Sequence, residues 1–143
     1  EEKVRAVLLQ VGLEEAIWKL PAEISGGMKK RAGLARAIVT EPKIILYDEP
    51  TSGLDPVTSR TIDELIMHLK RDLGVTSVVV THDMISALTV GDRIAMLHQG
   101  RVVEVSTPAE FLRSKNPEVR DFLDAQHISS DFLKQRNTHE TTP

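Results

Sequence analysis

The 143-residue chain contains no cysteine, so it can form neither a disulfide framework nor a thiolate metal site. Aromatic residues make up only 3% of it, too few for a surface on which nucleic-acid bases stack. No apolar run approaches the roughly 20 residues of a membrane-spanning helix, and the longest are short pieces such as 44–47 and 77–81. Any role at a membrane therefore has to come through a partner.

The chain also has no large excess of charge of either sign. The 18 basic and 21 acidic residues give a net charge of −3, whereas nucleic-acid binders usually carry a basic excess. We therefore expect no nucleic-acid partner. What the chain does have is an apolar fraction of 41%, which is enough for a packed core.

The pattern along the chain predicts an α/β fold with a mainly parallel sheet, followed by a hairpin and helices at the carboxyl end. Residues 43–47 and 76–81 are apolar without polar alternation, which is typical of strands covered on both faces. Residues 93–97 and 101–105 are predicted to form the hairpin. Trp18 is expected to pack in the core. Helices are predicted to span residues 4–11, 25–39, 55–73 and 83–88 and to start near residues 107 and 116.

Polar residues follow both predicted parallel strands: Asp48 and Glu49 after the first, and His82 after the second. Chemistry gathers at the carboxyl ends of such strands. Two adjacent carboxylates suit phosphoryl transfer, because one can serve Mg²⁺ and the other can orient the attacking water. By itself, the pair fits a solvated acidic turn equally well. His82 by itself is as well explained by an ordinary helix cap.

Ser25, Gly26 and Gly27 are predicted to open a helix whose first amides are bare, which is an anion site. Basic residues follow in the first turn, where the helix dipole disfavours cations, so a negative group nearby would explain them. An ordinary cap with a solvated basic face is the alternative. Asp55, which ends the turn 51–55, is sufficiently explained as the cap of the next helix.

In their order and spacing these segments resemble the ABC ATPase family, strongly over about residues 20–100 and more loosely to 125. Residues 24–28 look like the signature motif, 44–48 like the Walker B strand and 52–55 like the D-loop. Glu49 is similar to the catalytic glutamate and His82 to the switch histidine. The resemblance implies the carboxyl-terminal part of a P-loop (RecA-like) ABC ATPase domain. Residues 1–41 would end its helical subdomain, 42–125 would belong to the RecA-like core, and 126–143 would form a polar tail.

The resemblance implies that two such ATPase protomers, as a homodimer, enclose ATP between them. Ser25, Gly26 and Gly27 would face the γ-phosphate of the partner's ATP, and Asp55 would couple the two sites. Asp48 would hold Mg²⁺ through water, Glu49 would polarise the hydrolytic water and His82 would sense the γ-phosphate. An integral-membrane permease would be the other partner, which would put the subunit peripherally on the cytoplasmic face of the inner or plasma membrane.

Residues 25–37 and 116–124 also resemble the Mla-type branch, the ATPases of bacterial phospholipid transport. Met28 stands where the common family pattern has Gln. We therefore expect phospholipid as the cargo. Two alternatives are a soluble ABC ATPase that remodels ribosomes or DNA, and a non-catalytic regulatory fragment.

No Gly-Lys pair occurs in the chain, so the loop Gly-x-x-x-x-Gly-Lys-Ser/Thr that cradles nucleotide phosphates is missing from it. Without that loop the β- and γ-phosphates have no primary grip. We therefore expect the chain to be the carboxyl-terminal part of a longer ATPase and to be inactive alone.

Overall fold

The computed structural model describes residues 1–129 and 132. The chain divides into two compact units, one of residues Glu1–Val90 and a second that begins at Gly91. Among the described residues, no helix combines the length and the apolar character that crossing a membrane requires.

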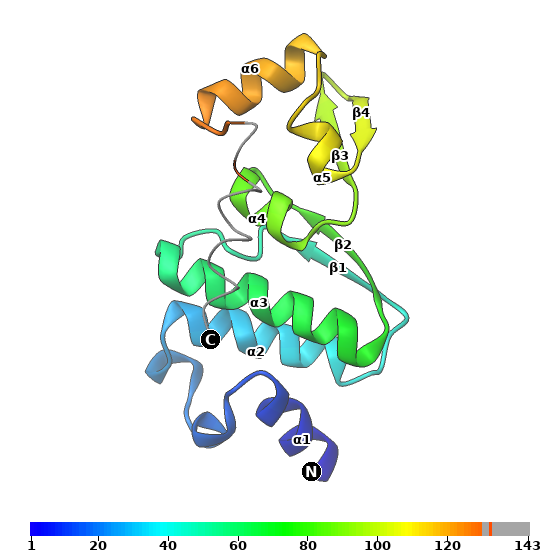
Figure 1. Ribbon diagram of the computed structural model, residues 1–143. Coiled ribbons are helices and arrows are strands. Elements are labelled where there is room, and N and C mark those ends of the chain that lie inside the picture. The colour runs from blue at the N-terminus through cyan, green and yellow to red at the C-terminus, as the bar shows by residue number, and fades with distance from the viewer. Residues whose placement is uncertain (130–131, 133–143) are drawn as a thin grey trace, which may run out of the picture. The chain divides into compact units, whose positions relative to one another are not determined.

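The first unit contains the first four predicted helices and both parallel strands (Figure 1). Gly74 ends its longest helix in the left-handed conformation, with φ of 61°, as a glycine after a helix commonly does. The elements are helix α1 (Glu2–Gln10), 3₁₀ turns at Glu14–Ala16 and Pro21–Glu23, α2 (Gly26–Ile38), β1 (Ile44–Asp48), α3 (Pro56–Leu73), β2 (Thr76–Val80) and α4 (Met84–Val90).

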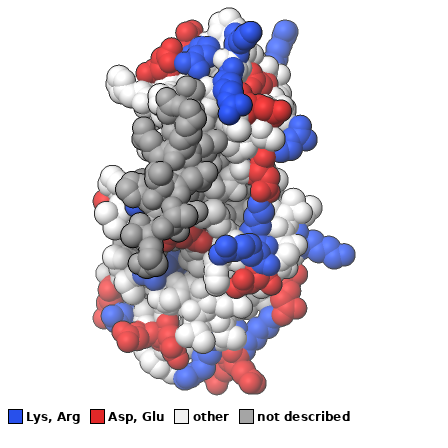
Figure 2. Space-filling model, in the orientation of Figure 1, with Lys and Arg blue, Asp and Glu red and all other residues white. Residues whose placement is uncertain are grey.

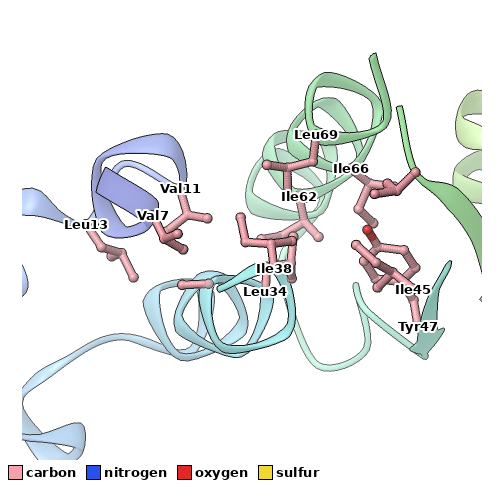
Figure 3. Packing of buried hydrophobic residues seen from close by; sticks show 12 residues of the cluster. Val7, Val11, Leu13, Leu34, Ile38, Ile45, Tyr47, Ile62, Ile66 and Leu69 are labelled. Atoms are coloured by element: carbon pink, nitrogen blue, oxygen red, sulfur yellow. The ribbon is translucent and has the colours of Figure 1, made fainter. Parts of the chain in front are cut away.

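Strands β1 and β2 pair in parallel, in a register that sets Ile44 opposite Thr76 and Asp48 opposite Val80. Alternate residues of β1, Ile45 and Tyr47, are buried. Figure 3 shows that they point toward α3, while α1 and α2 add side chains from the other side of the cluster. The core of this unit thus joins three helices to one face of β1. Its buried members are Val7, Val11, Leu13, Leu34, Ala35, Ile38, Ile45, Tyr47, Ile62, Ile66, Leu69 and Val75.

The other face of the strands corrects the expectation of burial on both sides. Leu46 is 77% exposed and Val80 59%. In the described residues β1 and β2 form a sheet of two strands, and the face that carries Leu46 and Val80 is exposed. Trp18 is a second correction: it is 84% exposed and does not pack in the core.

The second unit contains the predicted hairpin, formed by β3 (Ile94–His98) and β4 (Arg101–Ser106). Gln99 and Gly100 at its turn both have positive φ, the backbone that a two-residue hairpin connection needs. Thr107 and Glu110 form a capping box at α5 (Pro108–Phe111), and Asn116 caps α6 (Pro117–Ala125). The predicted starts of both helices are therefore confirmed.

The surface carries charges of both signs. Figure 2 shows Lys and Arg side chains interspersed with Asp and Glu on the face in view. The predicted tail 126–143 lies largely outside the described residues. Of its described part, Ile128 is buried and donates its N–H to the carbonyl of Leu123.

Candidate functional site

Parallel pairing of β1 and β2 brings two of the predicted site residues together. Glu49 follows β1 and donates its backbone N–H to the carbonyl of Val80, 2.9 Å away at the end of β2. His82 lies two residues beyond Val80. Glu49 and His82 are 33 residues apart in sequence, yet they meet at the same edge of the sheet.

One oxygen of the Glu49 carboxylate binds His82 twice. Glu49 Oε1 lies 2.8 Å from His82 Nδ1 and accepts the backbone N–H of His82 at 3.1 Å. The hydrogen bond and the charge of Glu49 raise the pKa of His82 above its ordinary value. Hence the imidazole stays protonated to a higher pH than it would without the carboxylate.

The second carboxylate oxygen, Glu49 Oε2, is in a different situation. It is buried and has no hydrogen-bond partner within the part of the chain that the structure describes. A buried acceptor without a partner is unfavourable. Glu49 therefore has one oxygen that His82 fixes and one that is enclosed by the protein with its acceptor capacity unused.

The structure adds a residue that sequence reasoning missed. Lys30, on α2, donates from Nζ to the backbone carbonyl of Glu49 at 2.8 Å. Its signal in the sequence was a cation near the start of a helix, where the dipole disfavours one. The acceptor could not be identified from the sequence, because it is a carbonyl 19 residues away.

The start of α2 lies against the segment that leads into α3. The Ser25 hydroxyl caps α2 by accepting the N–H of Met28 at 3.2 Å, and Ser25 is exposed. Gly27 is buried: a Cβ there would lie 2.6 Å from Cγ2 of Thr58. At Gly26 a Cβ would have only ordinary contact with Leu54. So Gly26 and Ser25 face solvent, whereas Gly27 also permits close packing of two helices.

Asp55 caps α3, as the sequence predicts. Its carboxylate accepts the N–H groups of Val57 and Thr58, each at 3.0 Å, and the Thr58 hydroxyl at 2.5 Å. These bonds, that of the Thr58 hydroxyl first, lower the pKa of Asp55. Through Thr58, this cap adjoins Gly27 near the start of α2.

Asp48 ends β1, where its side chain is exposed. Among the described residues, no three His, Asp or Glu side chains gather into a group that could hold a metal ion unaided. A single carboxylate fits Mg²⁺ that keeps several waters and takes its other ligands from substrate phosphates. A magnesium site at Asp48 would thus need a bound nucleotide for completion.

Comparisons with known proteins show what the chain and its fold are similar to. The model of the ABC transporter family matches residues 1–52. Together with the fold, this indicates the class: the chain has the fold of part of an ABC ATPase domain and is similar to ATP-binding subunits of ABC transporters.

Particular relatives come from two groups of bacteria. The methionine import ATP-binding protein MetN of Xanthomonas campestris is 42% identical over 93% of this chain and 40% of its own length. The probable ribonucleotide transport ATP-binding protein mkl of Mycobacterium leprae is 40% identical over 99% of this chain and 42% of its own. The chain spans about two fifths of these curated relatives.

Two solved structures share the fold. One is cbiO1 from Clostridium perfringens, part of the ABC transporter complex cbiONQ, with a TM-score of 0.74 and 32% identity. The other is the ADP conformation of an ATP-binding cassette of an ABC transporter, with a TM-score of 0.76 and 26% identity. Each match covers 85% of this chain and 48% of the other. The predicted α/β fold of part of an ABC ATPase domain is confirmed.

Proposed function

We propose that the chain is the carboxyl-terminal part of the ATP-hydrolysing subunit of an ABC transporter. The observation that supports this most directly is the Glu49 carboxylate. One of its oxygens is fixed by His82, and the other is buried without a partner in the described residues. The Glu49 carboxylate, held by His82 at the end of β1, would orient and polarise a water molecule for attack on a phosphate.

The neighbouring residues suit the rest of this reaction. Asp48 at the end of β1 would hold Mg²⁺ through water, and Mg²⁺ would neutralise charge that develops on the phosphate oxygens. His82 would contact the γ-phosphate from β2 while its Nδ1 keeps Glu49 in place. The raised pKa of His82 favours the cationic imidazole, which suits an anionic neighbour.

A second protomer would complete the site. The exposed start of α2, with Ser25 and Gly26, presents backbone N–H groups that would bind the γ-phosphate of the partner's ATP. Gly27 permits the close approach of α2 to Thr58, beside Asp55. Asp55 would thereby couple the two sites. We retain the division into a helical subdomain (1–41), a RecA-like core (42–125) and a tail (126–143) as part of this proposal.

The Glu49→Gln variant tests the proposed chemistry in a subunit that contains this chain and a phosphate-binding segment. Glutamine keeps the shape of the side chain but is no base, so phosphate release should fall about 10²- to 10⁴-fold. ATP-bound dimers should still appear in size-exclusion chromatography. Glu64→Gln, on the exposed side of α3, is the matched control. Phosphate release by Glu49→Gln at the parental rate would show that Glu49 is not the catalytic base.

The partner and the cargo are further parts of the proposal. An integral-membrane permease would place the subunit at the cytoplasmic face of a membrane, in keeping with relatives named for import and transport. Phospholipid as cargo rests on residues 25–37 and 116–124 alone, whereas those relatives are named for methionine and ribonucleotide. Purification of the subunit with its permease, followed by lipid extraction, tests both. Recovery without any permease would favour a soluble ABC ATPase.

A further inference from the structure

Glu49 has an unusual backbone conformation for its residue type. Its φ is 47°, in the left-handed region, and Pro50 follows it. The left-handed region costs free energy for any residue with a Cβ, and the residue before a proline normally takes an extended conformation. Such a conformation persists when the surrounding contacts fix it. The contacts of Glu49 therefore decide where its carboxylate points.

Two main-chain hydrogen bonds and one side chain fix the backbone of this residue. Its N–H donates to Val80, and its carbonyl accepts the N–H of Ser52 at 3.2 Å and the ammonium of Lys30 at 2.8 Å. The bonds to Val80 and Ser52 come from elements adjacent to Glu49 in the sheet and in the turn. Lys30 is different, because it reaches the same carbonyl from α2.

The position of Lys30 is unfavourable for a cation, and the hydrogen bond to the Glu49 carbonyl compensates for this. It is the fifth residue of α2, near the positive end of the helix dipole, and its side chain is partly buried. A lysine at such a place loses hydration and side-chain freedom. The Glu49 carbonyl supplies a partial negative charge at charge-assisted hydrogen-bond distance.

We propose that Lys30 is a positioning residue for Glu49: its ammonium holds the left-handed carbonyl and so keeps the carboxylate on His82. The importance of this positioning for catalysis rests on the proposed function. Because Lys30 and Ser25 lie on the same helix, the bond also links the signature segment to the catalytic strand end within one protomer. A shift at the start of α2 would then change the position of Glu49.

The pKa of His82, measured by NMR titration of its ring in the 143-residue chain, tests the role without ATP. Lys30→Met removes the donor and a positive charge. Loss of charge alone raises the pKa of a nearby histidine, whereas loss of the Glu49 contact lowers it toward about 6.5. We expect lowering. Lys30→Gln, too short to keep the bond, should act likewise, and Lys30→Arg should retain the parental value.

Lys29→Met provides the control for charge, since Lys29 is the exposed neighbour on the same helix. Its His82 pKa should stay unchanged or rise slightly. If Lys30→Met or Lys30→Gln, whichever folds, leaves the pKa of His82 unchanged or raises it as Lys29→Met does, Lys30 does not position Glu49. Circular dichroism identifies the folded variants.

In the ATP-hydrolysing subunit, Lys30→Met should lower kcat about 10- to 100-fold while KM for ATP changes little. The two proposals fail separately. If Lys30→Met lowers the pKa of His82 but Glu49→Gln retains full turnover, positioning stands and the catalytic assignment falls. If Glu49→Gln is inactive and Lys30→Met alters neither the pKa nor kcat, only the positioning role is overturned.

Discussion

At the scale of single residues, the contact between His82 and Glu49 makes stability depend on pH. Both atoms of the pair, His82 Nδ1 and Glu49 Oε1, are 2.8 Å apart, and His82 remains 78% exposed. The hydrogen bond raises the pKa of His82 in the folded state. Because the folded-state pKa is raised, protonated His82 stabilises the fold at pH values below its unfolded-state pKa, which is about 6.5. This contribution is lost as the pH rises through the folded-state pKa.

The Glu49→Gln variant should therefore lose more stability at pH 6 than at pH 9. Below about pH 6.5 the parental chain has the full contribution of protonated His82, and at pH 9 it has little. Urea midpoints of the parental chain and the variant at the two pH values measure the difference. Glu64→Gln, which removes an exposed carboxylate from α3, should shift the midpoint equally at both. A Glu49→Gln loss that is larger at pH 9 would contradict the assigned direction.

Much of the candidate site could be predicted because its residues stand next to recognisable strand ends and helix starts. Asp48 and Glu49 come after an apolar strand, and Asp55 precedes a proline that begins a helix. The left-handed backbone of Glu49 could not be predicted, since a residue before Pro50 normally avoids that region. Its cause is tertiary, in bonds from distant residues such as Lys30.

At the scale of elements, α2 and α3 make their close contact at a glycine, Gly27, which has no side chain beyond hydrogen. A Cβ at Gly27 would approach Cγ2 of Thr58 to 2.6 Å, so the Thr58 side chain or one of the two helices would have to shift. At Gly26 the nearest atom would be 3.6 Å away, an ordinary contact. The two glycines therefore differ: the packing of α2 on α3 requires Gly27 but does not require Gly26.

Gly27→Ala should destabilise the chain by about 1–3 kcal/mol, the usual range for an overpacked contact. Thr58→Ser removes the clashing methyl and keeps the hydroxyl that donates to Asp55, so the double variant should recover part of the loss. Gly26→Ala should be neutral or slightly stabilising, because alanine favours helix and meets no clash. Urea unfolding of the four variants gives the coupling energy. Equal losses for the two glycine variants would show that Thr58 does not limit the approach.

Element types were easier to predict than their environment. The capping residues Ser25, Asp55, Thr107 and Asn116 mark helix starts by local chemistry, which tertiary contacts did not override. Continuous apolar runs predicted β1 and β2, but not that one face would be exposed at Leu46. An apolar side chain in a strand indicates that burial is favourable. It cannot tell which segment covers it, or whether that segment is within the chain.

At the scale of the whole molecule, the two units differ in how many proposed site residues they contain. All seven residues assigned to nucleotide chemistry, from Ser25 to His82, lie in Glu1–Val90. The second unit begins at Gly91, with its hairpin β3–β4 and the capped helices α5 and α6. Proposals about phosphate chemistry therefore depend on residues of the first unit, and the variants that test them lie there.

The first unit contains the groups that we propose to act on a phosphate, but not the Gly-x-x-x-x-Gly-Lys loop that would hold one. The chain has no Gly-Lys pair, so the amides and lysine that grip β- and γ-phosphates in P-loop proteins are not within it. Asp48 supplies one carboxylate for Mg²⁺, which needs phosphate oxygens to complete its ligands. Ser25 and its helix would serve a second protomer's nucleotide.

Titration calorimetry of ATP and Mg²⁺ into the 143-residue chain should accordingly give no binding in the micromolar range. Helix termini and a single carboxylate, each worth about 1 kcal/mol or less at exposed positions, fall well short of the roughly 8 kcal/mol that a micromolar Kd requires. Sodium triphosphate titrated under the same conditions controls for heats of dilution and nonspecific charge. If ATP bound with micromolar affinity and triphosphate did not, the chain would have a nucleotide site independent of a P-loop, and the roles of Asp48 and Glu49 would have to be assigned again around it.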